Sequence, residues 1–343
     1  MSATPPTYLP VNQAWLDRRT ETIIEPELPI VDAHHHLWER PGWRYMFGDL
    51  LEDLGSGHKI IATVFAQCRS MYRAGGREEL RPVGETEFVN GVAAMSASGR
   101  YGPTRVCAGI VGHADLQLGA RVREVLEKHI RVAAERFCGI RHISAWDADA
   151  SVMNPAYGPP RGLLGDSSFR QGFACLAPLN LAFDAWLYHP QIDELTALAR
   201  AFPQTRIVVD HVGGPIGIAG YADRREEIFA QWRSSIRELA KCPNVFAKLG
   251  GLGMLVGGFG FHLRAEPPSS EDLASAWRPF IETCIEAFGT NRCMFESNFP
   301  VDKGSYSYAV GWNAFKRLAS GCGAAEKEDL FSRTAKRFYN LAD

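Results

Sequence analysis

Eight short hydrophobic runs recur along the chain, and most of them precede a stretch that could form a helix. The runs are rich in β-branched and aromatic residues and are six to nine residues long, as strands usually are. Several are hydrophobic at nearly every position, which is typical of parallel strands covered on both faces. They span residues 30–36, 60–68, 106–112, 137–143, 181–189, 206–212, 245–250 and 292–299.

The segments between these runs carry helix signals. After the third run, hydrophobic residues follow the helical period at Val122, Val125, Leu126, Ile130 and Ala133. Pro190 is well placed to open a helix after the fifth run, and Ser269 with Asp272 resembles a capping box after the seventh. Residues 326–341 are predicted to form a terminal helix that packs on the outside.

This alternation predicts a (β/α)8 barrel, the TIM-barrel fold, as a single α/β domain. A doubly wound open sheet is the alternative, but it usually has a glycine-rich phosphate turn after its first strand, and none follows residues 30–36. Residues 1–28 are rich in proline and are predicted to form an irregular N-terminal arm. The barrel should therefore span residues 29–343.

Three long segments, residues 38–58, 145–172 and 251–270, follow the first, fourth and seventh runs. Loops that follow strands lie on the catalytic face of a barrel. The segments contain the aromatic residues Trp38, Trp43, Trp146, Tyr157, Phe259 and Phe261. These side chains are expected either to line a pocket for a substrate with ring character or to pack the loops against one another.

Composition restricts the partners. The net charge is -2 and there is no long basic run, so nucleic acid and anionic membrane surfaces are not expected partners. No hydrophobic stretch approaches the roughly 20 residues that span a membrane, and the N-terminus lacks the features of a signal peptide. The eight cysteines form no C-x-x-C pair and are expected to be buried thiols in a reducing cytoplasm. The sequence is compatible with a monomer or a homo-oligomer.

Histidines stand at the ends of four predicted strands. His34 and His36 end the first run, and alternation should point them to one side and His35 to the other. Such a pair can begin a metal site, although buried histidines also serve structural roles. His142, His189 and His211 end the fourth, fifth and sixth runs. In a barrel these side chains can converge on one mouth, which favours a metal or acid–base site.

The arrangement resembles the amidohydrolase superfamily, specifically its lactonase-like "amidohydrolase 2" branch, over roughly residues 30–341. The matching residues are V-D-A-H-H-H-L-W (31–38), G-I-R-H (139–142), His189, V-D-H-V-G-G-P (209–215) and S-N-F-P (297–300). The resemblance implies a hydrolase that adds water to a carbonyl.

The resemblance also implies roles for particular residues. His34, His36 and His189 would hold a divalent ion, zinc or manganese, although some members act without metal. His211 would be a second-site ligand or would orient water.

The resemblance implies that Arg141 binds a substrate carboxylate, and the alternative is an ion pair at the barrel rim. His142, Trp146 and Arg69 are further candidates for contact with a small-molecule substrate.

The eighth run departs from the family pattern. Members usually carry an aspartate at the position of Asn298, and a neutral amide cannot act as a general base. We hypothesise that Glu296, on the same side, supplies the missing charge as base or metal ligand, while Asn298 hydrogen-bonds water or substrate. A structural Glu296–Lys248 pair and Asp302 as base are the rival explanations.

Two aspartates flank the histidines. Asp32 is expected to orient an imidazole from behind. Asp210 should point away from His211 if the strand is regular.

The leading functional hypothesis is a hydrolase that opens a lactone ring of a small anionic substrate, either aromatic-derived or a sugar acid. The alternatives are a non-oxidative decarboxylase of an aromatic or unsaturated acid, and a binding protein that has lost the strand-8 base.

Overall fold

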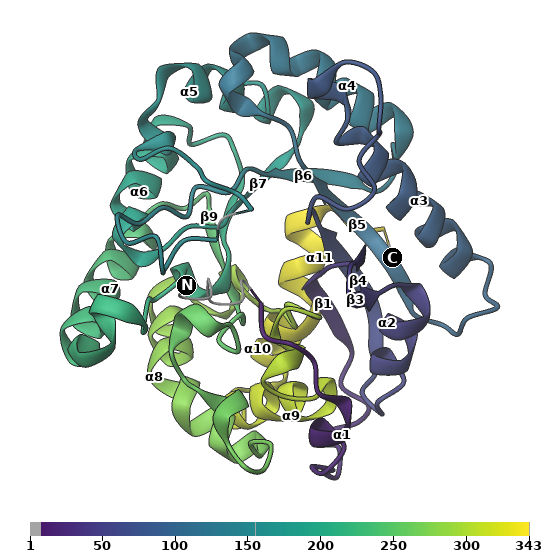
Figure 1. Ribbon diagram of the computed structural model, residues 1–343, viewed down its shortest axis with the longest axis vertical. Helices are drawn as coiled ribbons and strands as arrows, with labels where there is room; N and C mark the ends of the chain where they lie inside the picture. The colour runs from purple at the N-terminus through teal and green to yellow at the C-terminus, as the bar shows by residue number, and fades with distance from the viewer. Residues whose placement is uncertain (1–7, 155, 343) are drawn as a thin grey trace.

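The computed structural model describes residues 8–154 and 156–342 and shows a barrel of parallel strands surrounded by helices (Figure 1). The eight strands follow one another around the barrel in the order in which they occur along the chain. They are β1 (Ile30–His35), β4 (Ile60–Ala66), β5 (Arg105–Gly112), β6 (Phe137–Arg141), β7 (Ala182–Ala185), β8 (Ile207–Val209), β9 (Val245–Leu249) and β10 (Cys293–Phe295). The predicted (β/α)8 barrel and all eight predicted strands are confirmed.

The barrel closes between its first and last strands through the residues that follow β10. The Asn298 amide donates to the His34 carbonyl at 2.9 Å, and the His36 amide donates to the Phe299 carbonyl at 2.8 Å. This seam fixes the end of β1 against the segment after β10. The histidines of the first strand and the residues near Asn298 are therefore neighbours.

Helices cover the outside of the barrel, and their order matches the predicted alternation (Figure 1). The principal helices are α3 (Val83–Ala97), α4 (Val122–Val132), α5 (Ser167–Phe173), α6 (Ile192–Ala201), α7 (Arg225–Leu239), α8 (Ser270–Phe288) and α9 (Tyr308–Leu318). The predicted capping box is present at the start of α8, where the Ser269 hydroxyl accepts from the Asp272 amide at 3.1 Å. A hairpin of β2 (Trp38–Arg40) and β3 (Trp43–Tyr45), followed by α2 (Phe47–Leu54), fills the loop after β1.

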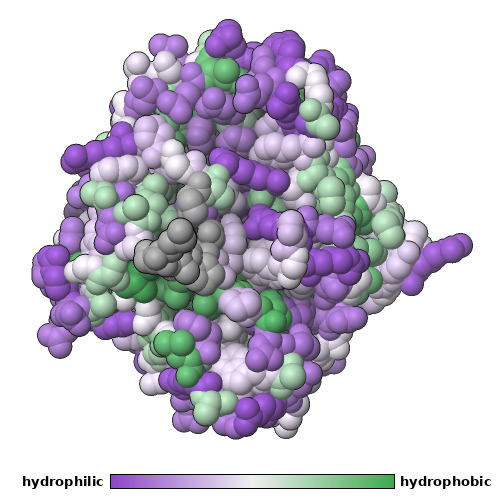
Figure 2. Space-filling view, viewed as in Figure 1, coloured by the Kyte–Doolittle hydropathy of each residue, from purple (hydrophilic) through white to green (hydrophobic). Residues whose placement is uncertain are grey.

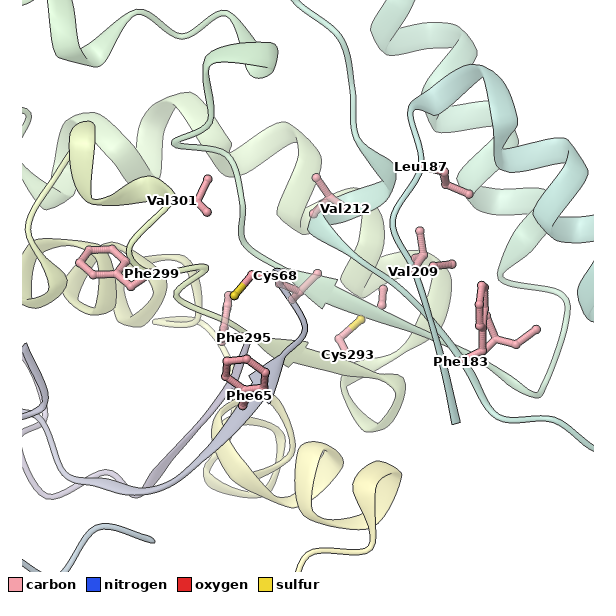
Figure 3. Close-up of a cluster of buried hydrophobic side chains, with 14 of the residues drawn as sticks. Phe65, Cys68, Phe183, Leu187, Val209, Val212, Cys293, Phe295, Phe299 and Val301 are labelled. Atoms are coloured by element: carbon pink, nitrogen blue, oxygen red, sulfur yellow. The ribbon is translucent and has the colours of Figure 1, made fainter. Parts of the chain in front are cut away.

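Two layers of side chains make the core. Outward-facing residues of the strands pack against the helices, as Figure 3 shows for Phe65, Phe183, Val209 and Phe295. The ring of Phe295, for example, stacks on Phe315 of α9 with centroids 4.7 Å apart. Inward-facing residues form a separate cluster inside the barrel; they include Val31, Ala33, Val64, Val111, Ala182, Val208 and Met294.

The C-terminal segment packs against the interior side chains of the barrel. The predicted terminal helix is confirmed as a continuous helical segment of α10 (Ala324–Glu328), a π-helical turn and α11 (Thr334–Tyr339), but its predicted outer position is wrong. Phe338 and Tyr339 join the interior cluster, and the Tyr339 hydroxyl donates to Asp184 Oδ2 at 2.8 Å. Burial of these two aromatic rings against the barrel interior explains why the helix lies beneath the strands (Figure 1).

The described part of the N-terminal arm contains one short helix, α1 (Gln13–Leu16), and crosses to the loop after β9. The indole of Trp15 donates to the Arg264 carbonyl at 3.1 Å. Tyr8 and Leu9 reach the mouth of the barrel. The extent of the arm, residues 1–28, stays a prediction, and residues 1–7 lie outside the described residues.

Polar and charged residues cover most of the face in Figure 2, where hydrophobic residues form small separate patches. All eight cysteines are free thiols, and six of them are buried, as expected. Among the described residues, no helix is long and apolar enough to cross a membrane.

Candidate active site

A cavity of about 390 Å³ opens at the carboxyl ends of the strands. Its walls are mostly hydrophobic and aromatic, and its polar groups come from the strand ends. The wall residues include Tyr8, Trp38, Ile143, Val152, Trp186, Tyr188, Met254 and Val256. The side chains that bring polar chemistry are His36, Arg141, His211 and Asn298. A pocket with an apolar body and a few converging polar groups is typical of a small-molecule site.

The two predicted histidines meet at the end of β1. Nε2 of His34 and Nε2 of His36 are 3.2 Å apart, whereas His35 points to the other side and contacts Thr63 Oγ1 at 2.8 Å. Nδ1 of His36 donates to the Ala66 carbonyl at 2.7 Å, which leaves the lone pair of this neutral ring on Nε2. Burial lowers the pKa of both rings well below the ordinary value, and nearby cations lower it further. Both imidazoles are therefore neutral near pH 7.

Glu296 lies behind the histidines and holds a third ring. Its Oε1 accepts from Nδ1 of His211 at 2.6 Å and from the His211 amide at 3.1 Å. Its Oε2 is 3.1 Å from Nδ1 of His34, and the carboxylate is fully buried. Oε2 has no hydrogen-bond partner among the described residues, so Glu296 orients the ring of His211 and leaves Nε2 of that ring for the cavity.

A lysine lies beneath this layer. Nζ of Lys248 is 2.6 Å from Asp184 Oδ2, 3.1 Å from Asp210 Oδ1 and 3.0 Å from His34 Nδ1. Burial lowers the pKa of Lys248, but the two aspartates raise it more, so it stays above its ordinary value. The direct carboxylate partners of Lys248 are therefore these aspartates, and the predicted pairing of Lys248 with Glu296 is wrong.

Arg141 ends β6 and stands at the floor of the cavity. Its Nη1 is 3.1 Å from Nε2 of His34 and 3.6 Å from Asp210 Oδ2, and its Nη2 donates to the Gln67 carbonyl. Among the described residues, Nε of Arg141 has no hydrogen-bond partner. The guanidinium thus makes an ion pair and also faces the cavity, so both predicted roles are compatible with its position.

Asn298 follows β10 in a left-handed conformation, with φ of 56°, which asparagine tolerates better than most residues. Its Nδ2 donates to Asp302 Oδ1 at 2.8 Å, and this contact directs the amide oxygen to the cavity. Asp302 Oδ2 accepts from the Gly253 amide at 2.9 Å and the Tyr306 hydroxyl at 2.7 Å. Burial raises the pKa of Asp302 to about 6, but its oxygens are occupied by these donors, so it positions Asn298 and the neighbouring loops.

The remaining candidates lie away from the histidine pair. β7 ends at Ala185, four residues earlier than predicted, so His189 falls in a 3-10 turn (His189–Gln191), where its Nδ1 accepts from the Ile216 amide at 3.3 Å. Burial lowers the pKa of His189 to about 4. Among the described residues, the ligand atoms within 4.8 Å of one another come from His34, Asp210 and His211. The structure does not bring His189 into this group.

The other substrate candidates divide between two places. His142 and Arg69 line a second, smaller cavity of about 100 Å³. Trp146 lies outside both sets of lining residues, and its carbonyl accepts from Gln191 Nε2 at 2.5 Å. Trp186, which we did not single out from the sequence, lines the main cavity and packs its ring on His211 with centroids 4.7 Å apart.

Both flanking aspartates differ from expectation because the main chain departs from regular alternation. Asp210 lies on the inward side, two residues after Val208 of the interior cluster, and the positive φ of His211 (54°) and Val212 (49°) brings His211 to the same side. The register of β1 shifts between Asp32 and His35. Asp32 consequently accepts from the hydroxyls of Ser297, at 2.6 Å, and Tyr308, at 3.0 Å, and orients no imidazole.

The donor set fits a divalent ion. Nε2 of His34 lies 3.2 Å from Nε2 of His36, and ligand atoms of His34, Asp210 and His211 lie within 4.8 Å of one another. Oε2 of the buried Glu296 beside them has no hydrogen-bond partner among the described residues. Imidazole and carboxylate donors suit zinc or manganese. Nη1 of Arg141 competes for the same His34 nitrogen, so an ion would have to share this site with the guanidinium.

Glu85 of α3 binds main-chain amides after β4, beside the site. Its burial leads us to expect that the stability of the protein depends on pH. Its Oε1 accepts from the amides of Cys68 and Ser70 at 2.9 and 2.7 Å, and burial raises its pKa from 4.5 to about 7. The folded state therefore retains a proton that the unfolded state loses, and the free energy of unfolding falls as pH rises between these values. The free energy of unfolding of Glu85→Gln should rise by about 2.5 kcal/mol relative to that of the parent protein between pH 5 and pH 8. Urea unfolding at both pH values measures this, and an equal difference at both would contradict it.

Comparison with known proteins agrees with this geometry. The protein is 32% identical to the uncharacterized protein y4mH of Sinorhizobium fredii over 333 residues, which cover 92% of this chain and 99% of that one. It is 28% identical to an L-fucono-1,5-lactonase of Burkholderia multivorans, over 91% of this chain and 96% of that one. A crystal structure of a Burkholderia multivorans amidohydrolase with bound zinc has a TM-score of 0.69 at 25% identity and covers 91% of this chain and 99% of that chain. The amidohydrolase family model matches residues 31–341, and the chain belongs to this family.

Proposed function

We propose that the protein is a hydrolase that opens a lactone ring, with His211 as the general base. The observation that carries this proposal is the buried Glu296 carboxylate, which lies 2.6 Å from Nδ1 of His211, a residue that lines a mostly apolar cavity. A histidine whose Nδ1–H is held by a carboxylate presents a basic Nε2 to the substrate side. This arrangement supplies the base that Asn298 cannot supply.

The steps follow from the positions of the side chains. Nε2 of His211 takes a proton from water as the oxygen attacks the lactone carbonyl, and Glu296 stabilises the imidazolium that forms. The amide oxygen of Asn298 can accept a hydrogen bond from the same water. His211 then returns the proton to the ring oxygen as the carbon–oxygen bond breaks, which gives the hydroxy acid.

Arg141 acts on the opposite side of the reacting carbonyl. The guanidinium belongs to a residue that lines the cavity, and its charge stabilises the negative charge that develops on the carbonyl oxygen. After ring opening the same group binds the new carboxylate. His34 and Asp210, whose ligand atoms lie within 4.8 Å of each other, would hold a divalent ion, and this ion would further polarise the carbonyl when bound.

The test is a lactone-hydrolysis screen with protein purified without chelators, preceded by elemental analysis. We expect release of one acid per lactone, at a rate that depends on the zinc or manganese content. Carbon dioxide release from an aromatic or unsaturated acid, without lactone turnover, would instead establish a decarboxylase. Ligand binding without turnover of either class would establish a binding protein.

The resemblance implies that His189 is a metal ligand, whereas the structure groups His34, Asp210 and His211 without it. A substitution of His189 distinguishes these two ligand sets. We propose that His189→Gln keeps its metal content and a kcat within about threefold of the parent value, because His189 lies outside the group of His34, Asp210 and His211. His34→Gln, at a member of this group, is the matched variant and should lose at least tenfold in metal affinity. Elemental analysis after dialysis measures both, and loss of metal from His189→Gln would restore His189 as a ligand.

A further inference from the structure

One wall of the main cavity is a hydrophobic cluster that is separate from the two layers of the core. It is built from the loops that follow β6, β7, β8 and β9, so the barrel fold brings its parts together. The members that line the cavity include Val152, Met153, Trp186, Tyr188, Ile218 and Val256. Trp186, Ile218 and Val256 are only partly buried in this cluster. They therefore present apolar surface that a bound substrate would remove from water.

Polar side chains on this side of the cavity are already paired within the protein. The hydroxyl of Tyr188 donates to the Val152 carbonyl at 2.9 Å. Nδ2 of Asn154 donates to the Tyr8 hydroxyl at 3.3 Å, and Oδ1 of Asn154 accepts from the Ala156 amide at 3.0 Å. A substrate hydroxyl placed against this wall would lose its water and meet groups that have partners, which is unfavourable.

The charge of the cavity is confined to its strand-end side. No aspartate, glutamate or lysine is among the described residues that line the cavity, and Arg141 ends β6 beside the reaction centre. His36, His211 and Asn298 likewise stand within a few residues of the strand ends, whereas the apolar wall comes from positions farther along most of the loops. The cavity thus has a polar floor for the reacting ester and an apolar wall for the rest of the substrate.

The volume of the cavity exceeds what a lactone ring needs. At the roughly 30 Å³ that a water molecule occupies in the liquid, about 390 Å³ holds about 13 groups of that size. A six-membered lactone ring with its carbonyl oxygen fills only about half of this space on the same measure. The remainder is large enough for a substituent of about the size of the ring itself.

We propose that the apolar wall binds an uncharged hydrophobic substituent; this rests on the proposed lactone hydrolysis and names the substrate as a lactone that carries an alkyl or aryl group. Each methylene that such a group removes from water increases affinity by about fourfold. A charged or polyhydroxylated substituent would instead face hydrocarbon or paired polar groups and would lose solvation without replacing it.

The first test compares four six-membered lactones in the parent protein. δ-Decalactone carries a pentyl chain and 6-phenyl-δ-valerolactone an aromatic ring, whereas δ-valerolactone is unsubstituted and L-fucono-1,5-lactone carries hydroxyl groups. We expect kcat/KM for at least one of the two hydrophobic lactones to exceed the values for the other two by at least about tenfold. A smaller preference, or a preference for L-fucono-1,5-lactone, would overturn the proposal.

The second test changes the wall and leaves the proposed catalytic residues unchanged. Val256→Thr and Ile218→Thr each place a hydroxyl on the wall, and Leu263→Thr is the matched control because Leu263 is 79% exposed and does not line the cavity. We expect at least one wall variant to lose about fivefold or more in kcat/KM for the preferred hydrophobic lactone, with δ-valerolactone and the control unchanged. A smaller loss in both wall variants, or an equal loss for δ-valerolactone, would overturn the proposal.

Failure of the proposed function is recognised separately, because the parent protein would then hydrolyse none of the four lactones. The wall is then tested by the binding of two open-chain acids, 5-hydroxydecanoate and L-fuconate, followed through the fluorescence of Trp38 and Trp186 in the main cavity. Binding of 5-hydroxydecanoate that is at least about tenfold tighter supports the apolar wall without turnover. A smaller difference, tighter binding of L-fuconate, or no binding of either acid would overturn it.

Discussion

Replacing Glu296 with glutamine is expected to lower kcat by about 10³- to 10⁴-fold and to change KM little. The carboxylate oxygen that holds Nδ1–H of His211 at 2.6 Å would become part of an amide that can also donate. An amide NH2 facing Nδ1 favours the tautomer with its proton on Nε2, and that nitrogen can then no longer accept a proton from water. Loss of the orienting carboxylate in a serine-protease triad has an effect of about this size, for the same reason. Steady-state hydrolysis of a lactone identified by the screen measures the change.

Glu296→Asp is the matched control for this prediction. It keeps the charge but shortens the side chain by one methylene, so we expect a rate between those of the parent and the Gln variant. Circular dichroism and the unfolding midpoint establish that each variant is folded. Near-parental turnover by a folded Glu296→Gln protein would show that His211 does not need this carboxylate, and the proposed base would be wrong.

The barrel could be predicted from the sequence because each strand has a local signal in its hydrophobic pattern. Each hydrophobic run is long enough to cross the barrel wall once, and the intervening helices carry their own period and caps. The pairing of His34 with His36 also follows from local geometry, since alternation over two residues needs no distant information. Glu296 was recognisable because a carboxylate inside a barrel needs a partner.

The positions of the other site residues could not be predicted, because they lie where the strands end and regular alternation stops. Alternation predicted that Asp210 would point away from His211, but the positive φ at His211 reverses the expectation. Similarly, β7 ends four residues before His189, and the intervening turn carries this histidine away from the pair. The period of two is a property of a strand, and functional residues stand just beyond strand ends, so the pattern fails where the site begins.

The ion pairs beneath the histidines could also not be predicted from the local sequence pattern. Asp184 and Lys248 lie on β7 and β9, Asp210 directly follows β8 between them, and the three side chains meet only through the pairing of these strands. Burial raises the pKa of Asp184 to about 6, whereas Lys248 and neighbouring cations outweigh burial and keep the pKa of Asp210 below its ordinary value. The buried lysine therefore lets two carboxylates share the barrel interior with neutral imidazoles.

Lys248→Met should consequently be among the most destabilising substitutions in the protein. Nζ of Lys248 is 2.6 Å from Asp184 and 3.1 Å from Asp210, and all three side chains are fully buried. Removal of the cation leaves Asp184 without a cationic partner and Asp210 with Arg141 alone, 3.6 Å away. Breaking a buried ion pair in this way costs about 3–5 kcal/mol. Urea unfolding at pH 7, with the slope of the transition checked for constancy, measures the loss.

The double variant Lys248→Met with Asp184→Asn decides whether charge or packing is responsible. Asparagine at position 184 removes one of the two uncompensated carboxylates and still offers an acceptor to the Tyr339 hydroxyl. We therefore expect the double variant to recover about half of the free energy of unfolding that the single variant loses. If the single variant does not fold, recovery of a folded double variant still tests the argument. A single variant that loses less than about 1 kcal/mol, or a double variant less stable than the single one, would show that the lysine is held by packing and not by its charge.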